Sequence, residues 1–406
     1  MLGKIKVVDD IMGKGKTEFA IQEMQKDNDY NYFYITPYLD EIKRVKSKCE
    51  NRKFYEPGIE DFERVETKDN KLKDLHYLLG NNKDIISTHA LFKKSNEITK
   101  ELIKAGNYIL ILDEVMDVVR QMNLGKHDLA NMLELKLIEV KDNGLIVWNK
   151  EWEDYDGKFN EVKAMSKNKS LFVIDNTTIL MWTFPIEIFK CFQEVYILTY
   201  LFDGQVQKYY YDLYNIEYEY YHVEKNNDKY EIVLGKSNDD KINLIDKIHI
   251  LDNKKLNNIG DENYSLSATW YDKNKDNKEL LNKIKNNLNN YFRKIMKAPA
   301  STVLWTTFKD YKNIGKRYAK SFVSINIRAT NNFRDRIYLA YLINRYLNPF
   351  TKRFFQQNNV SVDEEMYALS EMLQWIWRSA IREGNEIWIY VPSRRMRKLL
   401  QNWLEN

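Results

Sequence analysis

An unbroken apolar run at positions 108–112, Tyr-Ile-Leu-Ile-Leu, constrains the fold of this chain more than any other stretch of its sequence. Because the run has no polar face to turn toward water, it predicts a central strand covered on both sides, as in a parallel sheet between helices. Four more β-branched or aromatic runs predict strands of the same sheet, at residues 5–8, 32–36, 84–88 and 194–199. Helix-like stretches separate these runs, so we expect the first half of the chain to be an α/β domain.

The second half of the chain shows the same alternation and predicts a second α/β domain. Its expected strands lie at residues 302–306, 322–327 and 386–391, and its expected helices lie at 333–347 and 363–382. A tyrosine-rich stretch precedes this half. We place the domain boundary at the start of that stretch, which gives an N-terminal domain of residues 1–205 and a C-terminal domain of residues 206–406.

Two stretches depart from the α/β alternation. Residues 138–147 predict a hairpin that turns at Asn143-Gly144, a dipeptide favoured where both turn residues need positive φ. We interpret the hairpin as part of an insertion in the N-terminal domain at about residues 125–170. The tyrosines between residues 209 and 221 are interpreted as a pair of strands with buried rings, rather than as a platform on which bases stack.

Composition excludes several classes of protein. The 406 residues contain 63 Lys and Arg against 59 Asp and Glu, so any nucleic-acid surface has to be local rather than a long basic tail. The two cysteines, Cys49 and Cys191, exclude a disulfide framework or a four-cysteine zinc site and suit a reducing compartment. The five scattered histidines predict no zinc site. Because no signal core or membrane helix is evident, we expect a cytoplasmic protein without membrane contact.

A phosphate-binding loop is predicted between the first strand and the first helix. The sequence there is Asp10-Ile11-Met12-Gly13-Lys14-Gly15-Lys16-Thr17. Glycines let backbone amides curl around a phosphate, Lys16 supplies charge to the β- and γ-phosphates, and the Thr17 hydroxyl can ligate Mg²⁺. We therefore expect a nucleotide to be bound by Gly13, Lys14, Gly15, Lys16 and Thr17. Asp10 stands where the usual pattern has its first glycine, and the alternative interpretation is an ordinary glycine-containing turn.

Two acidic residues, Asp113 and Glu114, end the central apolar run. Ligands bind at this edge of a parallel sheet, so we expect both residues to face the phosphate loop. Asp113 would hold Mg²⁺, directly or through water, and Glu114 would orient and deprotonate the attacking water. The alternative is an acidic helix cap that follows a strand and has no catalytic role.

Five shorter motifs follow along the chain: Ile35-Thr36-Pro37, Ser87-Thr88-His89, Leu198-Thr199-Tyr200, Thr306-Thr307-Phe308 and Arg328-Ala329-Thr330. In this order, and together with the loop and the acidic pair, they resemble the motifs of superfamily 2 helicases and translocases of the DEAD/DEAH-like, phage-encoded type. The resemblance implies two RecA-like parallel-sheet domains in tandem, with ATP and Mg²⁺ as cofactors. The loop begins after only nine residues, which leaves no room for the glutamine motif that reads adenine in DEAD-box members.

A last motif, Gln374-Trp375-Ile376-Trp377-Arg378 with the later Arg382, resembles motif VI of the same family. Trp377 replaces a glycine of that motif, and the second arginine comes one residue later. On a continuous helix, positions i, i+4 and i+8 share a face, so Gln374, Arg378 and Arg382 would all point at a γ-phosphate, one of them as an arginine finger. The alternative is a solvated helix face, and we expect both tryptophans in the core.

The resemblance also implies residues that contact nucleic acid. Single-stranded nucleic acid would lie across both domains and contact the hydroxyl groups of Thr36, Thr88, Thr307 and Thr330. Thr199 would couple hydrolysis to domain movement. The basic run at residues 394–398 offers further positive charge, and a solubilising role is an equal alternative for it.

These expectations describe a monomeric ATP-dependent helicase or translocase. We expect it to act on DNA rather than RNA, in phage or plasmid replication or recombination, together with replication proteins. Two other hypotheses stay open. One is a viral DNA-packaging ATPase, and the other is a nucleic-acid-sensing ATPase that hydrolyses ATP without unwinding.

Overall fold

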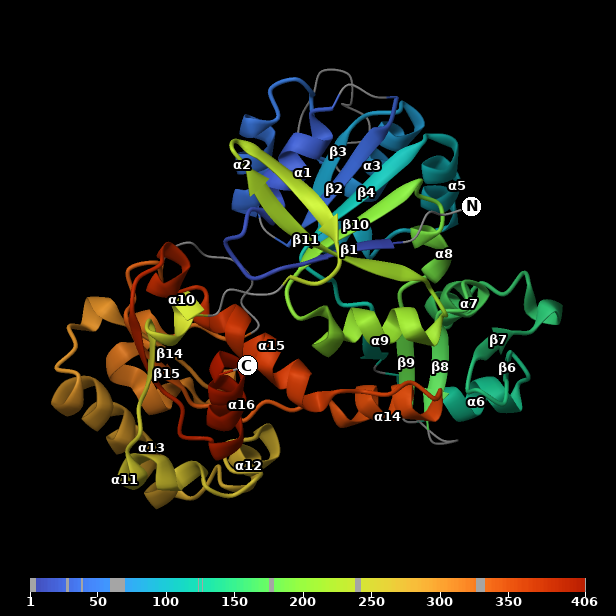
Figure 1. The fold of residues 1–406 in the computed structure, drawn as a ribbon. Helices are drawn as coiled ribbons and strands as arrows, with labels where there is room; N and C mark the ends of the chain where they lie inside the picture. Colours follow the sequence, from blue (N-terminus) through green and yellow to red (C-terminus); the bar gives the residue numbers. More distant parts are fainter. Residues whose placement is uncertain are drawn as a thin grey trace. The chain divides into compact units, whose positions relative to one another are not determined.

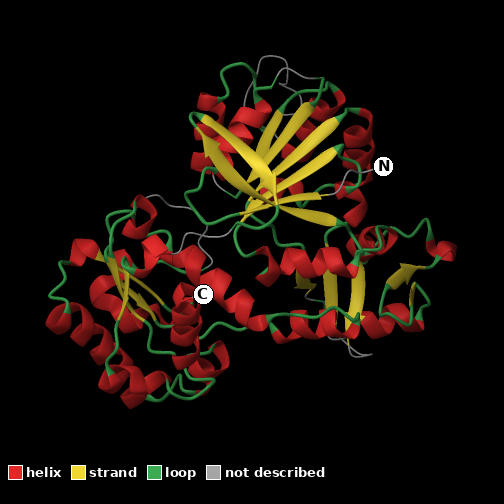
Figure 2. Ribbon diagram, in the orientation of Figure 1, coloured by secondary structure: helices red, strands yellow, loops and turns green. Residues whose placement is uncertain are grey.

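The computed structural model describes residues 5–26, 29–37, 39–58, 70–122, 124–125, 127–174, 179–237, 242–325 and 333–405. The chain forms two compact units, drawn as ribbons in Figures 1 and 2. The N-terminal unit comprises Met1–Asp10, Lys14–Ser237 and Asn348–Val362, and the C-terminal unit comprises Ile11–Gly13, Asn238–Leu347 and Asp363–Asn406. Each unit contains a parallel sheet and helices, so the expected class of tandem α/β domains is confirmed. Within the described ranges, every helix is too short or too polar to cross a membrane.

Seven strands form the main sheet of the N-terminal unit, in the order β12 (Lys229–Leu234), β11 (Tyr218–Asn226), β1 (Ile5–Asp9), β10 (Glu194–Thr199), β4 (Tyr108–Asp113), β2 (Asn31–Thr36) and β3 (Ile85–Thr88). Neighbouring strands are parallel except β11 and β12, which form an antiparallel hairpin. All five expected strands are present. All six residues of β4 are buried, as the apolar run at 108–112 predicts.

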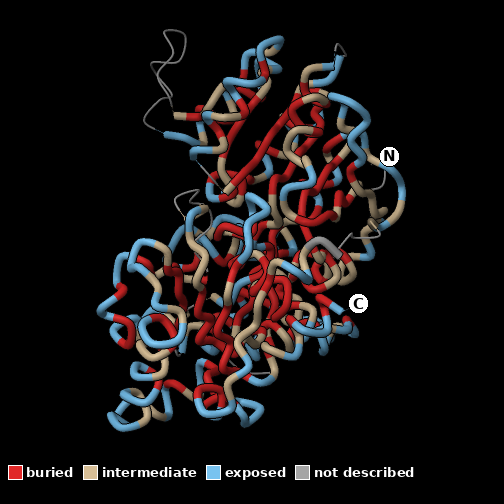
Figure 3. Tube along the Cα trace, turned by 60° about the vertical axis from the view of Figure 1, so that its left-hand side comes forward, coloured by how far each residue is buried: buried red, intermediate tan, exposed pale blue. Residues whose placement is uncertain are grey.

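Helices cover both faces of this sheet, because successive side chains of a strand point to opposite sides. In β2, Phe33 and Ile35 join one apolar cluster, whereas Tyr32 and Tyr34 join another. The second cluster includes residues of α1 (Lys16–Met24) and α2 (Leu39–Lys48). The first cluster includes residues of α3 (Lys71–Gly80), α4 (His89–Phe92), α5 (Glu97–Ala105), α8 (Ile186–Phe189) and α9 (Val206–Leu213). Figure 3 shows the resulting buried interior along the strands.

The segment between β4 and β10 contains the expected insertion. Its antiparallel sheet consists of β5 (Val119–Met122), β9 (Ile179–Thr183) and β8 (Leu171–Ile174), and its hairpin pairs β6 (Ile138–Val140) with β7 (Ile146–Trp148). Two helices, α6 (Asp128–Glu134) and α7 (Asn160–Lys167), belong to the same segment. The hairpin is confirmed, and Gly144 at its turn has a φ of +81°. A helix from much later in the chain, α14 (Pro349–Gln357), packs on this insertion, with the ring centroids of Phe354 and Phe172 5.2 Å apart.

The N-terminal unit continues past the expected boundary at residue 205. β11 pairs in parallel with β1, so it belongs to the first sheet and the compact unit extends to Ser237. The tyrosine-rich stretch also differs from its expected form, because Tyr209, Tyr210 and Tyr211 lie in the helix α9 and only its later part forms a strand. These three rings are buried, as expected. A continuous aromatic run does not distinguish a covered helix from a covered strand, since neither needs a polar face.

The C-terminal unit contains a four-stranded parallel sheet in the order β13 (Ile248–Ile250), β16 (Ile387–Tyr390), β15 (Tyr338–Tyr341) and β14 (Val303–Thr306). Its α-helices are α10 (Ile242–Ile245), α11 (Lys254–Asn257), α12 (Ala268–Lys273), α13 (Lys278–Asn289), α15 (Glu364–Ile376) and α16 (Arg394–Glu405). A π-helical turn at Asn290–Ile295 continues α13. Within this turn lies Tyr291, whose hydroxyl donates to the backbone carbonyl of Trp388 in β16, at 2.7 Å.

Two expected helices of this unit are wrong in part. Within residues 333–347, Tyr338–Tyr341 form the strand β15 between β14 and β16, because this apolar run is covered on both sides. The helix expected to reach Arg382 ends at Ile376 and is followed by a 3₁₀ turn at Ala380–Glu383. The strands expected at 302–306 and 386–391 are confirmed. Of the strand expected at 322–327, Phe322 forms a single bridge with Trp305, and residues 326 and 327 lie outside the described ranges.

The aromatic core of the N-terminal unit allows a test of this packing. Phe92 is fully buried, and its ring centroid lies 5.2 Å from that of Phe184 and 5.6 Å from that of Phe33. Phe92→Ala is expected to lower the free energy of unfolding by about 3–5 kcal/mol in urea titrations, because a cavity replaces these contacts. Leu39→Ala, at a side chain that is 63% exposed, is the control and should change it by about 0.5 kcal/mol or less. Equal effects of the two substitutions would contradict the packing.

Candidate functional site

The loop between β1 and α1 has a backbone that only glycine adopts easily. Gly13 and Gly15 both have a φ of +94°, in the left-handed region where a side chain is strained. Gly15 is the N-cap residue of α1, and none of the described side chains caps this helix. The amide groups of its first turn are therefore available to an anion at the carboxyl edge of the sheet. Lys14 lies on the same loop and is exposed.

Lys16, the first residue of α1, directs its ammonium group back into the loop. The ammonium group donates a hydrogen bond to the backbone carbonyl of Asp10. Burial lowers the pKa of Lys16, and the carboxylates of Glu114, Asp10, Asp9 and Asp113 oppose this effect because they favour the charged form. Lys16 thus places its amino group beside these carboxylates, at the place where phosphate would lie.

Asp10, which replaces the usual first glycine of the loop, has a structural contact of its own. Its Oδ2 accepts a hydrogen bond from the backbone amide of Val223 in β11, at 3.0 Å. The neighbouring Asp9 carboxylate accepts from the amides of Leu201 and Phe202, at 2.7 and 3.0 Å. The start of the loop is therefore tied both to the hairpin β11–β12 and to the segment after β10.

Asp113, at the end of β4, lies next to the first turn of α1. The Thr17 hydroxyl is 3.5 Å from Asp113 Oδ2, and the buried Tyr34 hydroxyl donates to the same oxygen at 2.5 Å. Burial raises the pKa of Asp113 to about 7, and the nearby Glu41 carboxylate acts in the same direction. The Tyr34 hydrogen bond opposes that shift because it stabilises the carboxylate.

Glu114 follows directly and has a φ of +74°, which is unusual for a residue with a side chain. Its amide donates to the carbonyl of Leu198 in β10, at 2.9 Å. Such a conformation costs free energy and often occurs at functional sites, where the surrounding structure maintains it. It turns the chain away from β4 directly after Asp113.

Thr17 and Asp113 are the residues that fit Mg²⁺. They offer a hydroxyl and a carboxylate oxygen 3.5 Å apart, next to the loop. Mg²⁺ prefers oxygen ligands and is usually held by one or two protein groups together with substrate phosphates and water. Among the described residues, no group of three His, Cys, Asp or Glu side chains could hold a metal, so the expected pair remains the candidate.

Thr199, at the end of β10, is buried and belongs to a hydrogen-bonded segment that the sequence did not reveal. Gln205 Nε2 donates to the Thr199 hydroxyl at 2.9 Å and to the carbonyl of Tyr200 at 2.7 Å. Two residues later, Gln207 Oε1 accepts from the amide of Met116 at 2.9 Å. The start of α9 therefore links the segment after Glu114 to the segment after Thr199. Neither glutamine belongs to a recognisable motif, so no sequence signal could have identified them.

The four threonines expected to contact nucleic acid lie in different surroundings. Thr36 and Thr88 are register partners at the ends of β2 and β3. Thr36 is fully buried, whereas the Thr88 hydroxyl caps α4 by accepting from the amide of Leu91 at 3.4 Å. Thr307, which follows β14 in the C-terminal unit, is 1% exposed. Thr330 lies outside the described residues.

The residues of the expected motif VI do not share one helix. Gln374 lies in α15, Arg378 follows the end of that helix, and Arg382 is exposed in the 3₁₀ turn, so the common face expected from i, i+4 and i+8 spacing is wrong. The Arg378 guanidinium donates to the carbonyls of Ser324 and Ile325, at 3.2 and 3.5 Å. Trp375 and Trp377 are buried, as expected.

Two arginines of the basic run at 394–398 have structural partners. The Arg395 guanidinium donates to the carbonyls of Arg345 and Glu364, at 2.7 and 3.2 Å. The Arg397 guanidinium donates to the carbonyls of Val391 and Pro392, at 2.8 and 3.0 Å. Their charge therefore serves the packing of the C-terminal unit.

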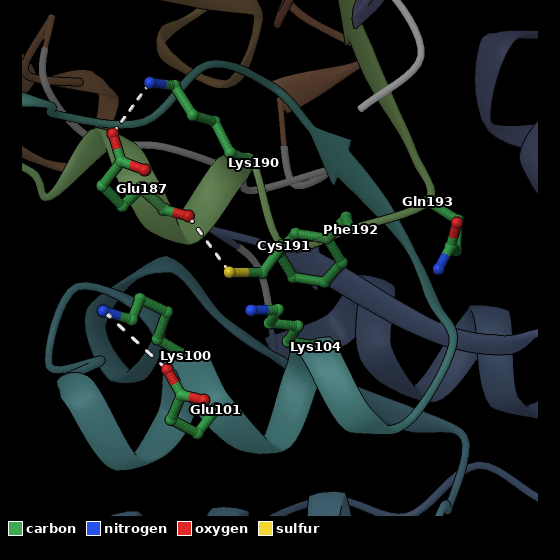
Figure 4. Close-up of a pocket in the computed structure, with 8 residues that line it drawn as sticks. All are labelled: Lys100, Glu101, Lys104, Glu187, Lys190, Cys191, Phe192 and Gln193. Carbon is green, nitrogen blue, oxygen red and sulfur yellow. Dashed lines mark hydrogen bonds and ion pairs between the residues drawn. The ribbon is translucent and has the colours of Figure 1, made fainter. Parts of the chain in front are cut away.

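A separate pocket of about 420 Å³ lies between α5 and the segment after α8 (Figure 4). Lys104 and Gln193 line it near the amino ends of β4 and β10, which is the edge of the sheet opposite to the phosphate loop. Its Cys191 thiol donates to the carbonyl of Glu187 at 3.2 Å, and burial raises the pKa of this thiol. The pocket is therefore not part of the candidate nucleotide site.

Comparison with solved structures finds proteins that resemble the whole chain in fold. The chain resembles Xpd4 of S. tokodaii with a TM-score of 0.50 and 11% identity, covering 99% of this chain and 94% of that one. A structure titled XPD helicase matches with a TM-score of 0.41 and 11% identity, over 98% of this chain and 94% of that chain. At this identity, the likeness to Xpd4 shows a shared fold.

Comparison with sequence families shows the family of the chain. Residues 242–404 match the YonV C-terminal Rossmann-like domain, and residues 119–182 match the YonV middle domain, which coincides with the insertion. The SPbeta prophage-derived protein YonV of Bacillus subtilis (strain 168) is 48% identical over 415 residues, which cover 99% of both chains. This degree of identity over the full length shows that the chain belongs to the YonV family.

Proposed function

We propose that this protein is an ATP-dependent nucleic-acid helicase or translocase that acts on DNA. The observation that carries the proposal is the convergence of Lys16, Thr17 and Asp113 at the carboxyl edge of a parallel sheet, with Thr17 and Asp113 3.5 Å apart. These residues form the arrangement that binds a nucleoside triphosphate and its metal. The fold shared with Xpd4 supports a motor rather than another class of nucleotide-binding protein.

Each residue of the site has a separate task in hydrolysis. Backbone amides at Gly13 and Gly15 and the Lys16 ammonium group bind the phosphates and neutralise their charge. Thr17 and Asp113 would hold Mg²⁺, which would supply positive charge to neutralise the charge that develops on the phosphates. Glu114 orients the attacking water and accepts its proton.

The C-terminal unit would supply further residues for hydrolysis. Gln374, Arg378 and Arg382 are the candidates for contact with the γ-phosphate, with Arg378 or Arg382 as an arginine finger. Thr36, Thr88, Thr307 and Thr330 are the candidates for nucleic-acid phosphates, and of these Thr36 and Thr307 are buried and would have to be uncovered first. Thr199 is the candidate for coupling. The hydrogen bonds that Gln205 donates and Gln207 accepts support this last role, because they join the segments that follow Thr199 and Glu114.

The biological setting is proposed to be phage DNA metabolism, such as replication or recombination, with the protein working as a monomer beside replication proteins in the cytoplasm. The prophage origin of its Bacillus subtilis relative supports this setting. A DNA-packaging ATPase and a nucleic-acid sensor that does not unwind are the competing outcomes of the experiments below.

Hydrolysis and its dependence on nucleic acid provide the first test. The steady-state ATPase rate is expected to rise severalfold with single-stranded DNA and to fall to background in Lys16→Ala, because the phosphate charge is then unopposed. Glu114→Gln should keep ATP binding and lose turnover. An ATPase rate that depends on Lys16 but does not change with DNA or RNA would contradict the motor. Stimulation of the rate without strand displacement or translocation would indicate a sensor.

The two arginines provide the second test. Arg378→Ala and Arg382→Ala are each expected to lower kcat, by up to about a thousandfold for an arginine finger, with little change in KM. Steady-state kinetics in saturating DNA would measure both constants. Because Arg378 also holds the carbonyls of Ser324 and Ile325, thermal unfolding of each variant should accompany the kinetics. Unchanged kcat in both variants would refute the motif VI assignment.

The contact between Tyr34 and Asp113 provides the third test. Tyr34→Phe removes only the hydroxyl that orients the Asp113 carboxylate, so the Mg²⁺ concentration for half-maximal hydrolysis should rise by about tenfold. Tyr32→Phe is a matched control, because this buried tyrosine lies on the same face of β2 and donates instead to the carbonyl of Glu23, at 3.0 Å. Equal Mg²⁺ dependence of the two variants would show that Tyr34 does not support the metal site.

A further inference from the structure

The hairpin β11–β12 is attached to the first helix by one side chain. Gln22 of α1 donates through Nε2 to the carbonyl of Asp228 and accepts through Oε1 from the amide of Tyr230, both at 2.8 Å. This pair of bonds holds the backbone of the hairpin turn beside α1. The bond from the Val223 amide to Asp10 holds the middle of β11 at the start of the phosphate loop. The hairpin is therefore held at the start of the loop and at the helix that follows the loop.

The attachment brings an aromatic ring against the phosphate loop. Tyr230 packs on Gly15 so closely that a Cβ built on this glycine would lie 2.2 Å from Tyr230 Cε1 and 2.5 Å from Cδ1. Lys225 of the same hairpin places its ammonium group 5.4 Å from the centroid of this ring. Tyr230 is half-buried, so part of its surface remains open. The ring and a positive charge thus lie at the N-terminus of α1.

Strand order indicates which part of a nucleotide this ring would meet. β1 lies between β10 and β11, and Asp113 and Glu114 follow β4, on the far side of β10. Thr17 and Lys16 lie near these acidic residues, so a metal and a γ-phosphate would be bound on the side of β10 and β4. The nucleoside is at the opposite end of the triphosphate. The nucleoside would therefore lie beside β11 and β12, where Tyr230 is located.

We propose that Tyr230 contacts the base or ribose of the bound nucleotide and that the β11–β12 hairpin forms the nucleoside subsite. The proposal rests on the nucleotide-binding function proposed above. Aromatic rings stack on any base, because every base has a π face, so this contact would contribute affinity rather than a hydrogen-bonded choice of base. The Gln22 clamp would then be a positioning contact that keeps the ring in place.

Inorganic tripolyphosphate, which has the phosphates of ATP and no nucleoside, provides the test. With Mg²⁺ present, calorimetry would compare the Kd of ATP and of tripolyphosphate for the full-length protein and its variants. Tyr230→Ala is expected to weaken ATP binding about tenfold, with little change for tripolyphosphate, because only the nucleoside contact is lost. Tyr230→Phe should retain both affinities. Lys229→Ala, at an exposed neighbour in the same hairpin, is the control.

Each other outcome has a distinct meaning. Equal weakening of ATP and tripolyphosphate in Tyr230→Ala would overturn the proposal, because the ring would then support only the loop. Unchanged ATP binding would overturn it as well. If Tyr230→Ala does not fold, Gln22→Ala releases the hairpin turn without touching the ring and should weaken ATP selectively. Failure of the wild-type protein to bind either ligand would instead refute the nucleotide site itself.

Discussion

The positive charge of Lys16 among four carboxylates is the interaction on which the candidate site depends. Asp9, Asp10, Asp113 and Glu114 all favour the charged form of this lysine. A partly buried ammonium group is costly without such partners, and a cluster of carboxylates is equally costly without the ammonium group. The two requirements meet because β1 and β4 end at the same edge of the sheet, separated only by β10. A triphosphate with Mg²⁺ would bring both signs of charge to the same edge. The phosphates could then pair with Lys16, and Mg²⁺ could pair with the carboxylates.

The residues that support this edge connect it with more distant segments. Asp9 binds the amides that follow β10, Asp10 binds an amide of β11, and Tyr34 of β2 donates to Asp113. Gln205 and Gln207 connect the segments after β10 and β4 in the same way. A change in the position of the loop or of Asp113 would therefore alter contacts of several strands. Such shared hydrogen bonds would connect the proposed hydrolysis with movement, since a buried polar group that loses one partner needs another.

The sequence predicted the sheet of the N-terminal unit well because burial leaves a strong pattern there. The first five residues of β4 are apolar and all six are buried, and the hairpin turn has Gly144 at a positive φ. The same reasoning was ambiguous where an apolar run is covered on all sides. Tyr209 to Tyr211 form a helix and Tyr338 to Tyr341 form a strand, opposite to what was expected in each case, because periodicity disappears when no side faces water.

By itself, the sequence determined the class of fold, the conformation of the glycine loop and the position of the acidic pair, because these depend on local constraints: continuous apolarity, glycines with positive φ, and carboxylates at a strand end. Only the tertiary structure decided which residues support them. Tyr34, Gln207 and Tyr230 are far in sequence from the groups they contact, and no local pattern specifies such partners. Gln205 is six residues from Thr199, but it belongs to no motif that would indicate this contact. It also decided that α15 ends before Arg378 and that β11 joins the first sheet. Both outcomes depend on packing between distant segments, which local periodicity does not encode.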